Sequence, residues 1–128
     1  MSSSVDSRVS DKPSTTDREL DECAQTLAMC ASACEHCATA CLGEPDVSSL
    51  ASCVRLNRDC AQLCWVAASF VARRSELTID VCRLCIEACD ACEAECAHHD
   101  RDHCRACAAA CRICSSICRT IAAHGLPA

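Results

Sequence analysis

The sequence has few of the residues that interrupt helices and few of those that favour strands. Its 128 residues include two glycines, three prolines, one phenylalanine, one tryptophan and no tyrosine, while alanine is abundant. Glycine and proline break helices, and aromatic residues favour strands. This composition therefore predicts an all-α protein, and the length suits one domain with a modest core.

The sequence lacks the features that are typical of several functional classes. The net charge is −6, and no basic run or aromatic platform indicates a nucleic-acid partner. Residues 1–20 are polar, without an apolar stretch or twin arginine, so we expect no export signal and a cytoplasmic protein. We also expect no membrane association, because no segment has the length and hydrophobicity expected of a transmembrane span.

Cysteine, by contrast, is very frequent, with eighteen in the chain. In residues 82–96 five cysteines recur at intervals of 3, 4, 3 and 4, the spacing of helix positions that face other helices. We call such a row of inward-facing positions a seam. The cysteines assigned to the four predicted seams are Cys23, Cys30, Cys34, Cys37, Cys41, Cys53, Cys60, Cys64, Cys82, Cys85, Cys89, Cys92, Cys96, Cys104, Cys107, Cys111, Cys114 and Cys118.

Local signals divide the chain into a tail and four helices. Residues 1–14 are predicted to be a flexible N-terminal tail and residues 15–125 a four-helix-bundle domain. The first helix opens with a Thr16–Glu19 capping box and ends at Gly43. Asp46, Ser75 and Asp100 are placed at the starts of the next three helices, and Gly125 and Pro127 after the last. Short connections predict an up-down-up-down four-helix bundle with a cysteine-lined core.

A regular helical spacing disfavours disulfides within a helix. Cysteines three or four apart lie about 5–6 Å apart at Cβ, whereas a disulfide needs about 3.8 Å. Clustered free thiols in a reducing compartment indicate a metal site or catalysis. Soft thiolates favour Cu(I), which two thiolates satisfy and which bridging thiolates bind at about one ion per cysteine, or slightly more with histidines. We expect near-linear sulfur–sulfur spans rather than isolated tetrahedra.

Three alternatives to copper storage remain at this point. A zinc-buffering thiolate protein would bind about one ion per four thiols. An iron–sulfur carrier is disfavoured by the regular helix around residues 30–41, which lacks the looped backbone of such clusters. An enzyme with a nucleophilic cysteine is disfavoured because no single cysteine stands out beside a dedicated base. We therefore predict a protein that is not an enzyme.

The cysteine array resembles that of the bacterial four-helix-bundle copper storage proteins, in their cytosolic branch. The residues that carry the resemblance are Cys30-x3-Cys-x2-Cys-x3-Cys41, Cys53-x6-Cys-x3-Cys64, Cys82-x2-Cys-x3-Cys-x2-Cys-x3-Cys96 and Cys104-x2-Cys-x3-Cys-x2-Cys-x3-Cys118. The resemblance implies storage of many Cu(I) ions by the core thiolates and a homotetramer of bundles. It also implies that copper enters at one end of the bundle, near histidine ligands. Asn57 and Ala67 occupy seam positions that cysteine could fill.

The up-down topology predicts which end is open. His99 and His103 would gather beside Cys41, Cys53, Cys96 and Cys104, so this pole is predicted to be the mouth, with both histidines as copper ligands. Leu20, Leu27, Phe70, Val71 and Ile121 would form an apolar plug at the opposite pole. Trp65, beyond the second seam, is the candidate for an oligomer interface.

Overall fold

The computed structural model describes residues 14–127, and within that range it contains helices and no β-strand. The predicted tail, residues 1–14, lies outside the described residues except for Ser14, so it stays a prediction. The four helices are α2 (Asp17–Leu42), α3 (Ala51–Ala72), α4 (Thr78–Cys96) and α5 (Asp102–His124), with a short 3₁₀ helix η1 (Val47–Leu50) before α3.

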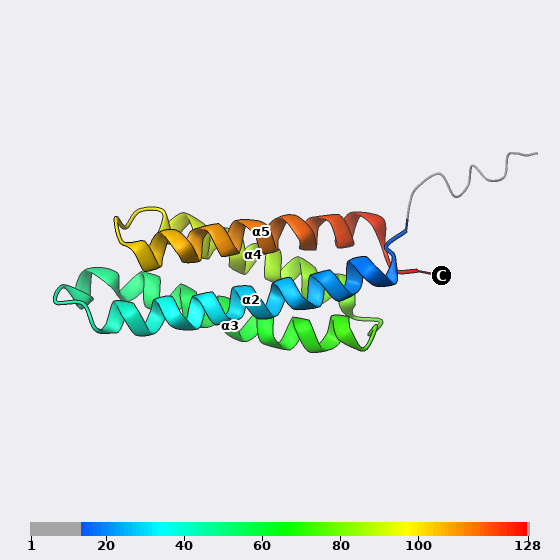
Figure 1. Ribbon diagram of the computed structural model, residues 1–128, viewed down its shortest axis with the longest axis horizontal. Coiled ribbons are helices and arrows are strands. Elements are labelled where there is room, and N and C mark those ends of the chain that lie inside the picture. The colour runs from blue at the N-terminus through cyan, green and yellow to red at the C-terminus, as the bar shows by residue number, and fades with distance from the viewer. Residues whose placement is uncertain (1–13, 128) are drawn as a thin grey trace, which may run out of the picture.

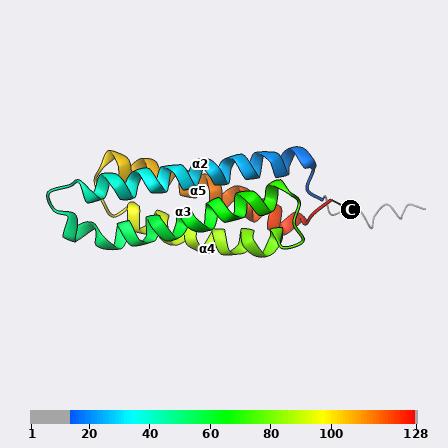
Figure 2. The ribbon, with the colours of Figure 1, turned by 90° about the horizontal axis from the view of Figure 1, so that it is seen from below.

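The helices form the predicted up-down-up-down bundle. Each helix packs against two neighbours in the cyclic order α2, α3, α4, α5, and the two views in Figures 1 and 2 show the four helices running alongside one another. The α2–α3 and α4–α5 connections lie at one end, and the α3–α4 connection and the start of α2 lie at the other (Figure 1). This arrangement confirms the fold class and brings the cysteines nearest the α2–α3 and α4–α5 connections to one pole.

The start of α2 and the end of α5 follow the sequence signals. The Glu19 backbone N–H donates to Thr16 Oγ1 at 3.1 Å, and the Thr16 N–H donates to Glu19 Oε1 at 2.8 Å, which completes the predicted capping box. Gly125 follows α5 with a φ of 77°, a backbone conformation that favours glycine. The Thr15 N–H donates to the Gly125 carbonyl at 3.1 Å and ties the two ends of the bundle domain together.

The three other predicted helix starts are shifted. Asp46 precedes η1 without a capping bond, because its carboxylate accepts from Ser49 and Arg101 instead. Helix α4 begins at Thr78 rather than near Ser75, whose hydroxyl accepts from the Leu77 N–H. Asp100 lies outside α5 and pairs with Arg105. In each case a tertiary or turn contact takes the side chain expected to cap the helix.

Helix α5 differs from the sequence expectation in one further respect. By length and composition it is long and apolar enough to cross a membrane. This differs from the prediction that the chain contains no transmembrane span. Its cysteines account for much of the apolar character, and all five lie buried in the bundle core. Such a helix is weak evidence of a membrane span, because the core helix of a soluble protein meets the same criteria.

Candidate metal centre

All eighteen cysteine side chains are buried free thiols. They come from the inward faces of all four helices, with small alanines such as Ala31, Ala61 and Ala108 beside them in the core. Because thiols are small and only weakly polar, they can fill the core of a copper-free bundle as apolar side chains do. The structure confirms the predicted cysteine-lined core.

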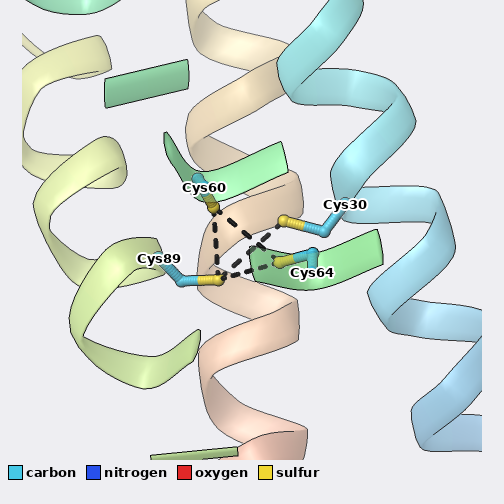
Figure 3. Close-up of side chains that lie close together, drawn as sticks. All are labelled: Cys30, Cys60, Cys64 and Cys89. Carbon is cyan, nitrogen blue, oxygen red and sulfur yellow. Dashed lines mark hydrogen bonds between the residues drawn. The ribbon is translucent and has the colours of Figure 1, made fainter. Parts of the chain in front are cut away.

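The sulfur atoms form compact groups rather than simple rows. In one group Cys89 Sγ lies 3.6 Å from Cys60 Sγ and 3.9 Å from both Cys30 Sγ and Cys64 Sγ. Figure 3 shows these side chains converging from α2, α3 and α4. A tetrahedron with 2.3 Å metal–sulfur bonds has edges of about 3.8 Å, so a single group is also compatible with zinc. The expectation of near-linear spans is therefore incomplete.

Neighbouring groups share thiols, and this sharing distinguishes the array from a set of separate sites. Within each group the ligand atoms all lie within 4.8 Å of one another. The four-thiol groups among the described residues include Cys30/Cys60/Cys64/Cys89, Cys30/Cys34/Cys60/Cys111, Cys34/Cys92/Cys107/Cys111 and Cys37/Cys41/Cys53/Cys104. The first three overlap, so a thiolate in two groups could bridge two Cu(I) ions.

The fourth group lies at the pole predicted to be the mouth. We call Cys37, Cys41, Cys53 and Cys104 the mouth cluster. His103 Nδ1 lies 3.6 Å from Cys37 Sγ, 3.6 Å from Cys104 Sγ and 3.8 Å from Cys41 Sγ. The imidazole is thus in position to act as a ligand beside these thiols, and only 14% of its side chain is exposed.

His99 occupies a different environment from His103. Helix α4 ends at Cys96, so His99 lies beyond the end of the helix. Its Nε2 lies 2.8 Å from Glu95 Oε2, and the hydrogen bonds of its ring within the described residues include no thiol. The role of His99 as a ligand stays a prediction. His36 and His98 are exposed.

The opposite pole is closed by apolar side chains. Leu20, Leu27, Val71 and Ile121 are fully buried, as predicted for the plug. Phe70 is only partly buried, with the Arg73 guanidinium 4.5 Å from its ring centroid. A three-thiol group lies at the Cys23 end of α2 and comprises Cys23, Cys82 and Cys118.

Asn57 places one amide inside the thiol core. Its side chain is fully buried, and its Oδ1 accepts from Cys92 at 3.2 Å, Cys107 at 3.3 Å and Cys96 at 3.5 Å. Its Nδ2 donates to Cys53 Sγ at 3.6 Å. The amide therefore links a mouth-cluster thiol to α4 and α5 and satisfies its own buried polar atoms. Its seam position was visible in the sequence, but its partners were not.

Sequence reasoning missed the ionic contacts that surround the mouth. Glu44 Oε2 lies 2.9 Å from His103 Nε2, and Glu44 Oε1 lies 3.4 Å from Arg101 Nη1. Arg101 also donates to Asp46 Oδ2 at 2.6 Å. No local motif in the sequence marks Arg101 as the partner of these carboxylates.

The copper-free protein should lose stability at alkaline pH. Burial raises the pKa of the Cys41, Cys53 and Cys104 thiols, whereas in the unfolded chain a cysteine titrates near about 8.5. As the pH rises, the unfolded chain therefore loses its thiol protons before the folded protein does. The contribution of these protonated thiols to the free energy of unfolding is fully present below about pH 8.5 and decreases as the pH rises above that value. We expect Tm to fall by roughly 10 °C between about pH 8 and pH 10.

Circular dichroism melts of reduced, copper-free protein would measure this effect. The matched control is the variant in which Cys41, Cys53 and Cys104 are replaced by alanine, which should show a shallower alkaline loss. An equal slope in the two proteins would contradict the assignment to these thiols.

Comparison with known protein families gives a match over most of the chain. The family described as "Copper storage protein" matches residues 16–123. A relative from Bacillus subtilis (strain 168), the "Uncharacterized cysteine-rich protein YhjQ", is 42% identical over 81 residues, which cover 63% of this chain and 75% of the relative. The family match spans the helical region that carries the cysteines.

Solved structures agree in fold and in sequence. The structure described as Cu(I)-bound copper storage protein BsCsp3 is 41% identical, with a TM-score of 0.79, and the match covers 82% of this chain and 99% of that one. A cytosolic copper storage protein from Streptomyces lividans, in a structure described as holding five coppers, is also 41% identical, with a TM-score of 0.81 and coverage of 87% and 98%. A second Streptomyces lividans structure, loaded with 10 copper equivalents, has a TM-score of 0.82, 38% identity and coverage of 84% and 86%.

Proposed function

The chain belongs to the copper storage protein family, and on that premise we propose that it stores many Cu(I) ions inside its helical bundle. The observation that carries the proposal is the overlap of the buried thiol groups. Cys30, Cys34, Cys60 and Cys111 each belong to two four-thiol groups. Shared thiolates let one sulfur bind two Cu(I) ions, so the load approaches one ion per cysteine without excess buried charge.

The proposed ligands are the eighteen cysteines together with His103 and His99. His103 has the stronger structural support, because its Nδ1 faces three thiols of the mouth cluster. Copper arriving at this pole would meet the imidazole and the mouth cluster first. It would then move inward past Asn57, whose amide contacts thiols on both sides of it. The role is storage rather than catalysis, in keeping with the family.

Location and assembly follow by similarity. The Streptomyces lividans relative is described as cytosolic, and we place this protein in the cytoplasm as well. We propose a homotetramer, as the family resemblance implies. An apolar groove of about 730 Å³ between α3 and α4 supports an interface there, with Trp65 44% exposed and Val66 and Leu84 about half exposed along it.

A Cu(I) titration tests the storage proposal directly. Reduced, anaerobic protein should saturate near the cysteine count, at about 18 ions per chain, because bridging thiolates need only about one Cu(I) each. The measurement is competition against a coloured Cu(I) chelator, with the free thiols counted on the same sample. Saturation at about four ions, the capacity of separate four-thiol sites, would contradict the proposal.

Zinc provides the matched control on the same preparation. A zinc buffer would bind about one Zn(II) per four thiols, and Zn(II) would displace Cu(I). The Cu(I)-loaded relatives give zinc buffering no support. We therefore expect Cu(I) to displace Zn(II) completely, since thiolates favour the softer ion.

A further inference from the structure

The two ring nitrogens of His103 lie in different environments. One nitrogen is directed toward the thiols of the core and the other toward the surface at the mouth. Nδ1 faces the mouth cluster, where Cys37 Sγ is 3.6 Å away. Nε2 faces away from it and lies 2.9 Å from Glu44 Oε2. The ring thus spans the space between a carboxylate and a set of thiols, and the position of its proton decides which nitrogen can bind a metal.

The carboxylate of Glu44 can only accept a hydrogen bond, so its contact with Nε2 requires that nitrogen to carry the proton. In the neutral ring, Nδ1 then keeps its lone pair and faces Cys37, Cys41 and Cys104. We infer that Glu44 is a positioning residue that fixes the His103 tautomer and so prepares Nδ1 to capture Cu(I) at the mouth cluster. The inference rests on the proposed storage function and assigns Glu44 a role in loading.

Glu44 is itself held in place by a second ion pair. Its other carboxylate oxygen, Oε1, lies 3.4 Å from Arg101 Nη1, and Arg101 also donates to Asp46 Oδ2 at 2.6 Å. Glu44 and Asp46 follow α2, while Arg101 directly precedes α5. The Arg101 side chain therefore joins the two connections at this pole. Only 26% of the Glu44 side chain is exposed, so the carboxylate has few other orientations open to it.

The same pole contains a matched pair without the thiols. His99 Nε2 lies 2.8 Å from Glu95 Oε2, and the Glu95 side chain is 27% exposed, much like Glu44. The described hydrogen bonds of His99 connect its ring to no cysteine. Replacing Glu95 removes the same charge from the same end of the bundle while leaving His103 and Glu44 in contact. A comparison of the His103 tautomer in the Glu95 and Glu44 variants therefore distinguishes positioning of His103 by Glu44 from a general loss of negative charge at the mouth.

Nitrogen NMR of the copper-free protein reads the tautomer directly. In ¹⁵N-histidine-labelled protein, long-range ¹H–¹⁵N correlations distinguish the protonated ring nitrogen from the unprotonated one, and His103 is assigned by its loss in the H103A variant. We expect the Nε2–H form to predominate in the wild type and in E95Q. The E44A and E44Q variants should show a mixture of both tautomers, because alanine accepts nothing and glutamine can donate as well as accept.

Copper transfer provides the functional readout. Stopped-flow mixing with a coloured bicinchoninate complex of Cu(I) follows the loss of colour as copper moves to the protein. We expect E44A and E44Q to slow the first phase of transfer about tenfold, the effect typical of removing the carboxylate behind a metal-binding histidine. D100N, which removes a charge from the same end of the bundle at an exposed side chain that pairs with Arg105 rather than with a histidine, should load at the wild-type rate. An E35Q variant, which removes an ion pair with Arg58 that is 3.4 Å long, controls for surface charge elsewhere.

The outcomes separate the inference from the storage proposal. A wild-type capacity of only a few ions would overturn storage, whatever the tautomer. A high wild-type capacity with an unchanged tautomer and loading rate in E44A would overturn the role of Glu44 alone. Equal slowing in E44Q and D100N would overturn positioning in favour of charge at the mouth. Circular dichroism of each variant shows whether the bundle is intact, and the NMR reading does not depend on copper.

Discussion

Replacing Cys30, Cys34, Cys60 and Cys111 together by alanine should lower the Cu(I) capacity by about eight ions rather than four. Each of these thiols belongs to two four-thiol groups. Their removal breaks three groups at once and leaves behind only two pairs, Cys64 with Cys89 and Cys92 with Cys107. Copper ions that depended on a shared thiolate would lose a ligand even though their other cysteine remains.

The matched control removes the same number of thiols outside the overlapping groups. Cys23, Cys82 and Cys118 form the three-thiol group at the end of the core away from the mouth cluster, and Cys85 Sγ donates to the Leu63 carbonyl at 3.5 Å. Their replacement by alanine should cost about four ions, one for each thiol. Both capacities are measured by chelator competition, together with helix content by circular dichroism.

Smaller variants keep the comparison informative if four alanines unfold the bundle. The pair Cys30→Ala with Cys111→Ala removes two shared thiols, and the pair Cys23→Ala with Cys82→Ala removes two that lie outside the overlapping groups. We expect the first pair to cost about twice as many ions as the second. Equal losses in the two pairs would show that each thiol binds copper independently of its neighbours.

Copper loading should also change the thermal stability of the protein by a very large amount. A ligand that binds only the folded state adds about 2.7 kcal/mol per site at a hundredfold excess over Kd. Several such sites together exceed the roughly 5–15 kcal/mol by which domains are usually stable. The thiols of each group named above come from at least two helices, so bound ions would join the helices to one another. We expect the fully loaded protein to melt above about 90 °C.

Differential scanning calorimetry of copper-free, half-loaded and fully loaded protein would measure this shift. A sample loaded and then stripped with a strong Cu(I) chelator is the control, and it should return to the copper-free Tm. A Tm that rises by less than about 5 °C in protein shown to carry a full load would indicate copper bound outside the core.

Much of the fold could be predicted because the local sequence signals, such as residue spacing and helix caps, agree with the helices that form. The alternation of cysteines at spacings of three and four places them on one face of each helix, and all eighteen are buried. The Thr16–Glu19 capping box forms as predicted. The starts near Asp46, Ser75 and Asp100 were misplaced because these side chains bond to partners such as Arg101 and Arg105, which no local pattern reveals.

The sequence predicted which residues could bind metal, but it did not predict which of them lie close together in one thiol group. Both histidines were predicted as ligands because the up-down topology brings them to the pole of Cys41, Cys53, Cys96 and Cys104. The structure places His103 Nδ1 against three thiols and His99 Nε2 against Glu95. The two outcomes differ because α4 ends at Cys96, whereas His103 lies within α5 and keeps its helical orientation.

The sequence by itself determined which side chains face the bundle axis and which metals they favour, because helical periodicity and thiol chemistry are local properties. The tertiary structure alone decided which thiols share a group, where the Asn57 amide lies among them and how Glu44 reaches His103. These contacts depend on the axial register between helices. That register is set by the connections and by packing across the core, and the periodicity of a single helix carries no information about it.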